Sequence, residues 1–356
     1  MIRINSIVLK NFRCYTSNNV VFLNNINILL GNNATGKTSI VEAIGLLSVG
    51  HSFRTNNDKE LIKNDQEAYF VEYNISDNKE KSKVSIAFDG KVRRIVVNGK
   101  QIKNLKDFIG KYKVISFIPE DIRIIVGEPK LRRKFLDYNI SIYNQEYLSN
   151  LVTYNRVLKE RNEVLKNYKE KNDEMLLKTY TDKLVECGKR IIEARESFIN
   201  EINTIINTKV EVLSDNKDNS SVMYKPNVDK DDFENSINKA KERDIAFATT
   251  TVGPHRDDFD ILINNKSASS YGSQGQIKTV ALGIKLCCVD IVKKINDNIL
   301  IVLDDVFGEL DEIRQNQILK LLKEDYQMFI TTTSINGIDE NILNNSNILN
   351  INDIRR

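Results

Sequence analysis

The segment GNNATGKTS, residues 31–39, constrains the fold of this chain more than any other feature. It follows the apolar run INILL and fits the pattern G-x-x-x-x-G-K-[ST]. In this pattern a loop between a strand and a helix surrounds phosphate groups with backbone N–H groups. We therefore predict an α/β fold that binds a nucleoside triphosphate together with Mg²⁺. The residues predicted to bind ATP here are Gly31, Asn32, Asn33, Ala34, Thr35, Gly36, Lys37, Thr38 and Ser39.

A second motif, ILIVLDDVFGELD at residues 299–311, places two carboxylates directly after an apolar run. A buried parallel strand delivers such residues to its carboxyl end, where open α/β sheets bind their ligands. We predict that Asp304 and Thr38 hold Mg²⁺, and that Lys37 and Asp305 are catalytic, Asp305 by orienting or deprotonating the attacking water. Most of the chain separates the two motifs, so a single sheet must be built from both chain ends.

The hydrophobic pattern predicts a strand-rich region, then a helical insertion. Short alternating or apolar runs predict strands at 2–9, 26–30, 69–73, 84–88, 92–97, 259–263, 298–303 and 329–334. Helices are predicted at 38–47, through much of 129–206, and from about residue 273, while the polar segment 214–231 is predicted to be a loop. The predicted organisation is an ATPase lobe from 1–118 and 273–356, interrupted by a mainly helical lobe at 119–272 without a long coiled coil.

Overall charge does not decide whether the chain binds nucleic acid, because 52 basic residues face 49 acidic ones. Basic residues are instead concentrated between 91 and 113, on a predicted hairpin with an Asn98–Gly99 turn. Such a patch suits the phosphate backbone of DNA, although an ordinary solvated surface remains the alternative. The predicted DNA-binding residues are Lys91, Arg93, Arg94, Lys100 and Lys103. A second basic cluster comprises Lys130, Arg132, Arg133 and Lys134.

Other features narrow the function by exclusion. Four cysteines without a C-x-x-C pair, and only two histidines, argue against a zinc site. No apolar run reaches the ~18 residues that a membrane span needs, so we expect a cytoplasmic protein with no membrane partner. His255 in GPHRDD lacks an accompanying nucleophile motif, and we interpret this segment as a structural or interface turn.

Three further segments resemble motifs of ABC-type ATPases. In GSQGQIKT, residues 272–279, Ser273, Gly275 and Gln276 match the ABC signature, whereas Gln274 replaces its first glycine. A simple helix cap at Ser273 is the alternative. GELD at 308–311 resembles the D-loop, and FITTTS at 329–334 carries threonines where the switch histidine of this class usually lies. Thr331, Thr332 and Thr333 are the candidates to replace that histidine.

The chain as a whole resembles the RecF family, whose fold is the ATPase head of the ABC and SMC class. The resemblance is carried by IVLKNFRCY (7–15), HSFRT (51–55), FIPEDIRIIVGEPKLRRKFLD (117–137), TTVGPHRDDFDI (250–261) and LDDVFGELD (303–311). It adds Arg13 as a candidate phosphate contact, with a solvated arginine at a strand end as the alternative. It also implies that Ser273, Gln274, Gly275 and Gln276 contact the ATP held by the other subunit of a homodimer.

The family resemblance implies a weak, DNA-stimulated ATPase that acts in DNA repair, replication and the SOS response. It implies ATP-dependent homodimers on double-stranded, gapped or junction DNA, associated with the nucleoid. RecR, together with RecO, would be a partner in helping to load the RecA recombinase. The alternative is the ATP-binding subunit of a membrane transporter, in which the P-loop and signature lie much closer together in sequence. A kinase or nuclease would not explain the signature and D-loop segments.

Overall fold

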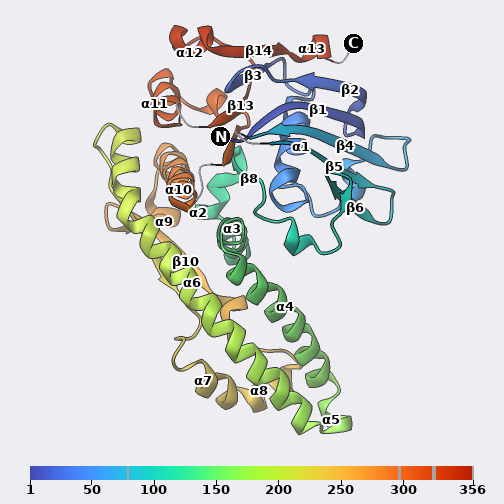
Figure 1. Cartoon of the computed structure of the whole chain (residues 1–356). Helices are drawn as coiled ribbons and strands as arrows, with labels where there is room; N and C mark the ends of the chain where they lie inside the picture. The colour runs from blue at the N-terminus through green and yellow to red at the C-terminus, as the bar shows by residue number, and fades with distance from the viewer. Residues whose placement is uncertain (78–79, 296–297, 323–325, 355–356) are drawn as a thin grey trace. The chain divides into compact units, whose positions relative to one another are not determined.

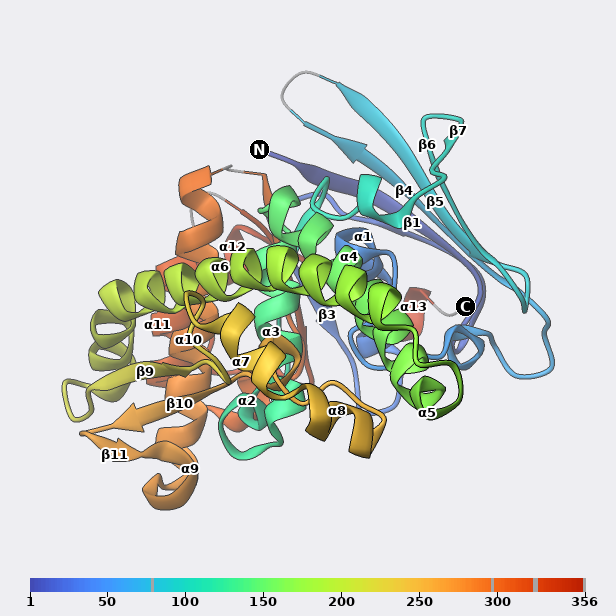
Figure 2. The same cartoon turned by 90° about the horizontal axis from the view of Figure 1, so that it is seen from below.

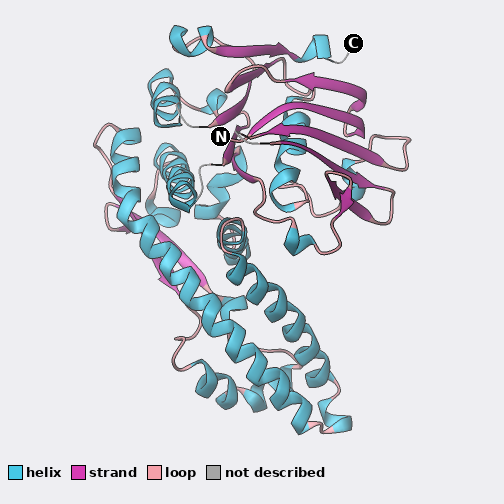
Figure 3. Ribbon diagram, in the orientation of Figure 1, coloured by secondary structure: helices cyan, strands magenta, loops and turns pink. Residues whose placement is uncertain are grey.

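The computed structural model describes residues 1–77, 80–295, 298–322 and 326–354, which fall into two compact units (Figure 1). Unit 1 contains residues 1–121 and 288–356, and unit 2 contains residues 122–287. Most strands belong to unit 1, whereas unit 2 is mainly helical (Figure 3). The predicted limits of independently folding domains, after residues 118 and 272, stay predictions.

The first sheet of unit 1 is antiparallel, with strand order β2-β1-β4-β5-β6-β7. Its strands are β1 (Arg3–Phe12), β2 (Tyr15–Val21), β4 (Tyr69–Ser76), β5 (Lys81–Phe88), β6 (Arg93–Val97) and β7 (Lys100–Gln101). Buried and half-buried residues alternate along β4, so one face of the sheet covers the core. Asn98 and Gly99 both have positive φ, 49° and 79°, which confirms the tight hairpin turn predicted between β6 and β7.

The second sheet of unit 1 is parallel and is built from both ends of the chain, as predicted. Its order is β14 (Ser346–Asn350), β3 (Ile26–Leu30), β13 (Gln327–Thr332), β12 (Ile299–Leu303) and β8 (Lys113–Phe117). Every pair of neighbours in it is parallel. The register pairs Leu30 with Thr332 and Leu303 with Ile330, so the carboxyl ends of β3, β12 and β13 meet at one edge. β13 ends at Thr332, two residues before the predicted end.

Helix α1 (Lys37–Val49) lies in the core of unit 1. Every residue of α1 except Thr38 is buried, because the helix contacts both sheets. On one side it contacts β8, β12 and β13, and on the other Tyr73 of β4 donates a hydrogen bond to the carbonyl of Ala43. The remaining elements of this part are η1 (Asp58–Leu61), η2 (Leu105–Asp107), η3 (Pro119–Ile122), η5 (Phe307–Glu309), α11 (Glu312–Leu322), α12 (Glu340–Asn344) and α13 (Ile351–Ile354).

Unit 2 is organised around two long helices, α4 (Gln145–Lys166) and α6 (Glu174–Ser214), which pack side by side in antiparallel directions (Figure 2). Gly188 of α6 allows close packing, since a Cβ there would lie 2.3 Å from the ring of Phe233. The other helices are α2 (Arg123–Val126), α3 (Pro129–Ser141), α5 (Tyr168–Lys171), α7 (Phe233–Lys239), α8 (Lys241–Phe247), η4 (Pro254–Arg256) and α9 (Ala268–Tyr271). Helix α10 (Gln274–Ile295) begins in unit 2 and ends in unit 1.

Unit 2 also contains a small antiparallel sheet, with order β11-β10-β9. Its strands are β9 (Ser220–Lys225), β10 (Asp258–Ile263) and β11 (Lys266–Ser267). The loop predicted at residues 214–231 is therefore wrong in its middle. The segment is polar in composition, but pairing with β10 and burial of Val222 make a strand of it, which is a tertiary effect that local composition does not reveal.

Candidate nucleotide-binding site

The P-loop connects the carboxyl end of β3 to the first residue of α1. Gly36 has φ 105°, a left-handed value that strongly favours glycine. A Cβ there would also lie 2.7 Å from Cys14 Sγ and 2.9 Å from Tyr15 Oη. Tyr15 Oη in turn donates a hydrogen bond to the carbonyl of Gly36, at 3.1 Å. The turn between β1 and β2, which belongs to the segment IVLKNFRCY, thus packs directly against the P-loop.

The side chain of Lys37 is held in place by hydrogen bonds to the backbone of the P-loop. Its side chain is only 3% exposed, and Nζ donates hydrogen bonds to the carbonyls of Gly31 (2.8 Å) and Asn32 (3.0 Å). Nζ also lies 4.0 Å from Asp305 Oδ1. The ammonium group is therefore held inside the loop, in the position from which a P-loop lysine reaches phosphates.

Asp304 and Asp305 follow β12 and face the P-loop, as predicted. Thr38 Oγ1 donates to Asp304 Oδ1 at 3.1 Å, and Thr331 Oγ1 donates to the same oxygen at 2.8 Å. Burial raises the pKa of Asp304 to about 6, although the hydrogen bond from Thr331 partly opposes this effect. Asp305 adopts φ 51°, and its N–H donates to Thr331 Oγ1 at 2.8 Å. Its side chain remains 42% exposed.

The oxygen atoms of Thr38 and Asp304, at the carboxyl edge of the parallel sheet, are suitable ligands for Mg²⁺. A hydroxyl and a carboxylate oxygen are hard ligands of the kind that Mg²⁺ prefers. Within the described ranges, no group of three or more His, Cys, Asp and Glu side chains could hold a metal ion by itself. This suits Mg²⁺, which usually takes one or two protein ligands and completes its shell with water and substrate phosphates.

A cavity of about 660 Å³ opens beside these residues in unit 1. It brings together the predicted residues Arg13, Ala34, Gly36, Lys37, Thr38, Ser39 and Asp305. Its other lining residues are Cys14, Arg54, Glu60, Ile62, Lys63 and Asn64. The cavity has mixed polar and apolar walls, with five basic or acidic side chains besides Lys37.

Glu42 organises the basic side of this cavity. It is fully buried on α1, and its two carboxylate oxygens accept hydrogen bonds from Arg13 Nε (2.8 Å) and Nη2 (2.6 Å). Arg54 Nη1 lies 3.6 Å from the same carboxylate, and Ser52 also donates to it. Arg13 Nη1 additionally donates to the carbonyl of Glu60, so Arg13 is fixed at the cavity wall.

Arg54 and Glu42 were missed from the sequence. A charged residue inside the apolar run of α1 was the available signal for Glu42, and the segment HSFRT was the signal for Arg54. Among the switch candidates, Thr331 is fully buried and bound to both aspartates, and Thr332 donates to the carbonyl of Ser334. Thr333 is exposed.

The signature residues lie in unit 2, at the start of α10. Ser273 N–H donates to Gln276 Oε1 (3.0 Å), and Gln276 N–H donates to Ser273 Oγ (3.3 Å). This reciprocal pair is a capping box, the helix-cap geometry considered from the sequence. Gln276 Nε2 also donates to Asp218 Oδ1 at 2.7 Å. Gln274 and Gly275 form the first turn between these two residues, and Gly275 has open space where a Cβ would lie.

The five predicted DNA-binding residues differ in their surroundings. Arg93 is paired with Asp58, with Nε–Oδ2 at 3.0 Å and Nη2–Oδ1 at 2.6 Å, and is only 21% exposed. Arg94 forms a more exposed pair with Asp89, at 2.8 Å. Lys91, Lys100 and Lys103 are exposed, and no carboxylate of the described residues lies within 4.0 Å of their amines. These three lysines are therefore the freest cations of the hairpin.

Comparison with known proteins identifies extensive similarity. A family model described as "AAA domain" matches residues 6–241. The chain is 38% identical to "DNA replication and repair protein RecF" of Lachnospira eligens over 350 residues, covering 97% of this chain and 95% of that protein. It is also 38% identical to the protein of the same name from Clostridium acetobutylicum, over 98% of this chain and 97% of that one.

Solved structures show the same relationship. A structure described as "recombination mediator protein RecF-ATP in RecFOR pathway" is 33% identical and has a TM-score of 0.87, with 95% of each chain covered. An SMC head domain from Pyrococcus furiosus has a TM-score of 0.56 at 15% identity, over 97% of this chain and 92% of that one, which supports the fold alone. No helix in the described part of the chain is long and apolar enough to cross a membrane.

Proposed function

The chain belongs to the RecF family of DNA replication and repair proteins, and we propose that it is an ATP-dependent recombination mediator that binds DNA as a homodimer. The observation that carries the proposal is the meeting of Lys37, Thr38, Asp304 and Asp305 beside one cavity. A P-loop lysine, a hydroxyl and two carboxylates at the carboxyl edge of a parallel sheet suit a nucleoside triphosphate with Mg²⁺.

The residues of the cavity have distinct roles in this proposal. The backbone of Gly31 to Thr38 and the ammonium of Lys37 would bind phosphates, while Thr38 and Asp304 would hold Mg²⁺, which neutralises phosphate charge when bound. Asp305 would orient the attacking water, and Arg13, anchored by Glu42 at the cavity wall, would contact a phosphate. Asp305 is one methylene shorter than a glutamate, which suits slow hydrolysis.

The homodimer part of the proposal rests on the signature residues. Ser273 to Gln276 present the start of a long helix, whose free N–H groups suit an anion. In the proposed dimer these residues contact the ATP that the partner holds in its own P-loop. An ATP present at ~100 times its dissociation constant stabilises the binding state by ~2.7 kcal/mol, so two molecules would favour closure by roughly 5 kcal/mol. That is enough to make a weak dimer predominate.

The DNA part of the proposal rests on the basic hairpin of unit 1. Lys91, Lys100 and Lys103 would contact the phosphate backbone, so binding would depend on salt and little on sequence. Double-stranded, gapped or junction DNA would be the ligand. The RecFOR pathway named for the solved relatives supports RecR and RecO as partners and RecA loading as the outcome.

Sedimentation with and without ATP tests the proposal. Asp305→Asn keeps the shape of the residue but removes its negative charge, so it should accumulate the ATP-bound dimer. Ser273→Arg should block closure and leave ATP binding to the monomer intact. An Asp305→Asn protein that stays monomeric at saturating ATP, or a Ser273→Arg protein that dimerises normally, contradicts an ABC-type dimer.

The ATPase rate with and without gapped or double-stranded DNA distinguishes the proposed repair function from the main alternative, the ATP-binding subunit of a membrane transporter. Stimulation by DNA supports the repair function. No stimulation, combined with recovery of the protein in a membrane fraction, would support the transporter subunit instead.

A further inference from the structure

A second basic cavity lies in unit 2, within that unit alone and lined by none of the ATP-site residues. Its volume is about 160 Å³, and α3, α4, α6 and η4 contribute to its walls. Its lining residues are Lys130, Arg133, Lys134, Asp137, Leu151, Tyr154, Asn155, Ile191, Arg195, Pro254 and His255. It therefore joins the second basic cluster of the sequence to the turn that contains GPHRDD.

The charge of this cavity is not balanced by its own acid. Four of the lining residues are basic and only Asp137 is acidic. Asp137 Oδ1 is already occupied, because it accepts hydrogen bonds from Tyr147 Oη (2.6 Å) and Arg195 Nη2 (2.8 Å). Within the described ranges, no carboxylate lies within 4.0 Å of the side-chain nitrogens of Lys130, Arg133 or Lys134.

Arg133 is the most constrained of the three cations. Its Nη1 donates to the carbonyl of Asp257 at 2.8 Å, which fixes the guanidinium at the wall. Burial, and then the nearby charge of Arg195, lower the pKa of Arg133 below its usual range. A guanidinium in this position gains from an added negative charge. Lys130 and Lys134 are exposed and lie one helical turn apart on α3, so both amines can reach the same anion.

The opposite wall is rigid and neutral. His255 Nε2 donates to the carbonyl of Thr250 at 3.1 Å, so Nδ1 accepts the hydrogen bond of Tyr154 Oη at 2.7 Å. Burial lowers the pKa of His255 to about 4, which keeps the imidazole neutral near pH 7. This side chain adds no charge, and Arg195 is paired with Asp137 and Asp257 at 2.8 Å each. The excess positive charge of the cavity therefore comes from the three cations of α3.

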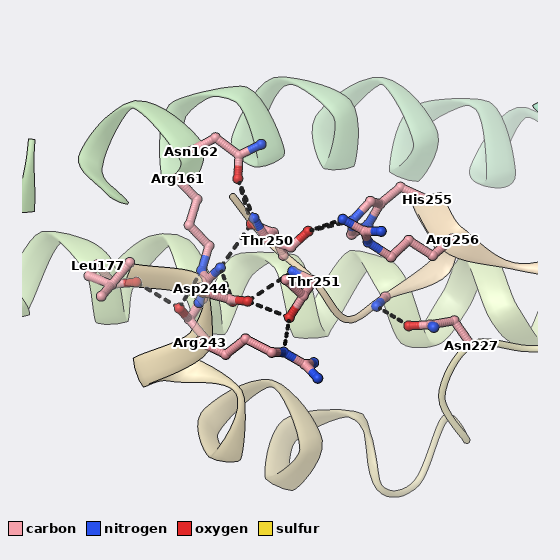
Figure 4. Close-up of polar contacts among 12 residues, drawn as sticks. Arg161, Asn162, Leu177, Asn227, Arg243, Asp244, Thr250, Thr251, His255 and Arg256 are labelled. Atoms are coloured by element: carbon pink, nitrogen blue, oxygen red, sulfur yellow. Dashed lines mark hydrogen bonds and ion pairs between the residues drawn. The ribbon is translucent and has the colours of Figure 1, made fainter. Parts of the chain in front are cut away.

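A buried network holds this wall in place (Figure 4). Thr250 is bound through its N–H and hydroxyl to Asn162 Oδ1, at 2.8 and 2.7 Å, and it accepts a hydrogen bond from Arg161 Nη1 at 2.8 Å. Arg161 forms an ion pair with Asp244 at 2.7 Å, and both side chains are almost completely buried. A wall fixed in this way loses little conformational freedom when a ligand binds.

The size of the cavity restricts the ligand. Its volume is about a quarter of that of the cavity beside the P-loop, 160 Å³ against 660 Å³. That space suits a single phosphate group with a few waters and is too small for a whole nucleotide. Two lysines and one arginine are well suited to bind the oxygens of a phosphate group. Arginine offers two parallel N–H donors, and each lysine offers a positive charge on a flexible side chain.

From these observations we propose that this cavity binds a phosphate group of the DNA backbone, giving unit 2 a DNA contact of its own. The proposal rests on the proposed DNA-binding function and extends it from the basic hairpin of unit 1 to α3. DNA is favoured over free phosphate because Lys130 and Lys134 lie exposed at the cavity, where a phosphate on a continuous chain can reach them.

The test uses the full-length protein and the double variant Lys130→Gln/Lys134→Gln. Both side chains are exposed on α3, so we expect the fold to be kept, which thermal melting checks. The matched control is Lys159→Gln/Lys178→Gln, two exposed lysines on α4 and α6 that do not line this cavity. Duplex DNA binding is titrated at several salt concentrations with ATP present.

We expect the cavity variant to bind duplex DNA about tenfold more weakly than the control. Its slope of log affinity against log salt should also fall by about 1 to 2, since each lost phosphate contact removes about 0.9. Affinity and slope equal to those of the control overturn the proposal. Inorganic phosphate alone forms a second arm. If phosphate raises the melting temperature of the wild type but not of the variant, while DNA binding is equal, the cavity binds free phosphate and the DNA proposal is wrong.

A third arm separates this proposal from the proposed function. Lys91→Gln/Lys100→Gln/Lys103→Gln alters the hairpin of unit 1 and leaves the cavity intact. If this hairpin variant loses DNA binding while the cavity variant keeps it, the cavity proposal fails and the proposed function stands. If the wild type binds no DNA with or without ATP, the proposed function itself fails.

Discussion

Asp304 offers a direct test of how the nucleotide site is built, because burial raises its pKa to about 6. A carboxyl group with a raised pKa in the folded protein prefers to be protonated there. Between pH 4 and pH 6 the folded protein keeps a proton that the unfolded chain releases, so stability falls as the pH rises. From about pH 7 upward both states are ionised and the loss is complete. Asp304 should therefore destabilise the free protein at neutral pH.

The size of this effect follows from the same pKa. The difference from the ordinary value of 3.8 is about 2 pH units, which at 1.36 kcal/mol per unit is about 3 kcal/mol at pH 8. At pH 5 the penalty is only about half as large, because most folded molecules still hold the proton. Asp304→Asn removes the charge but retains an oxygen that can accept from Thr331 and Thr38.

We therefore expect Asp304→Asn to be more stable than the wild type in the absence of metal and nucleotide. Urea unfolding in the presence of EDTA should give a gain that grows by roughly 1 kcal/mol between pH 5 and pH 8. Asp231→Asn is the control, since Asp231 is exposed and lies outside the nucleotide site. Adding Mg²⁺ and ATP should stabilise the wild type and have little effect on Asp304→Asn.

Two results refute this reasoning. One is an Asp304→Asn protein that is less stable than the wild type at pH 8 without metal. The other is a stability difference that does not change between pH 5 and pH 8. Either result means that burial does not keep this carboxyl group protonated in the free protein. If the variant binds Mg²⁺ and ATP as well as the wild type does, Asp304 is not a magnesium ligand.

Four other predictions concern the two units. Lys37→Ala should lose ATP binding or hydrolysis without unfolding the chain, because the interactions of Nζ are confined to the P-loop carbonyls and Asp305 in the described structure; normal affinity and turnover would contradict the P-loop assignment. Lys91→Glu/Lys100→Glu/Lys103→Glu should weaken DNA binding across all sequences and flatten its salt dependence, whereas unchanged titrations would place the DNA elsewhere. Asp218→Ala removes the hydrogen bond to Gln276, worth about 1 kcal/mol, so sedimentation should show an ATP-dependent dimer weakened about fivefold with unchanged ATP affinity in the monomer. Asp244→Ala leaves Arg161 buried without its carboxylate and should cost about 3–5 kcal/mol in urea unfolding, and a loss below 1 kcal/mol would show that water reaches Arg161.

Much of unit 1 could be predicted from the sequence because its signals are local. The run INILL followed by a glycine-rich loop, and the run ILIVL followed by two aspartates, each give a strand and a site residue. Neighbouring apolar strands that end in polar residues then meet at one edge of a parallel sheet. Asn98–Gly99 likewise specifies its own turn, since both residues tolerate positive φ.

The parts that were missed depend on contacts between distant segments. Strand β9 forms because β10 pairs with it, which the polar composition of residues 214–231 does not reveal. In sequence Arg93 resembles any surface arginine. In the fold it is paired with Asp58, a residue that precedes β4 in the chain, whereas Arg93 follows it. Glu42 acquires its role only when Arg13 and Arg54 converge on it. The sequence shows how many charged residues a segment has. Only the fold shows which of these charges are paired with one another and which can still bind a ligand.

Both parts of the proposed ATP machinery, the magnesium site and the signature turn, carry local energetic costs in the free chain. Asp304 is buried beside Asp305, and Asp305 adopts a left-handed backbone, so this edge is destabilised before ligand arrives. A magnesium ion would restore the preference of Asp304 for its charged form. At the start of α10, Gln276 is already engaged by Ser273 and Asp218, so a phosphate must either use the remaining N–H groups or displace these bonds. Part of the binding energy of ATP is thus used to ionise Asp304 and to displace the hydrogen bonds of Gln276. Such a cost in the free chain suits a protein that we propose forms its dimer only when ATP is bound.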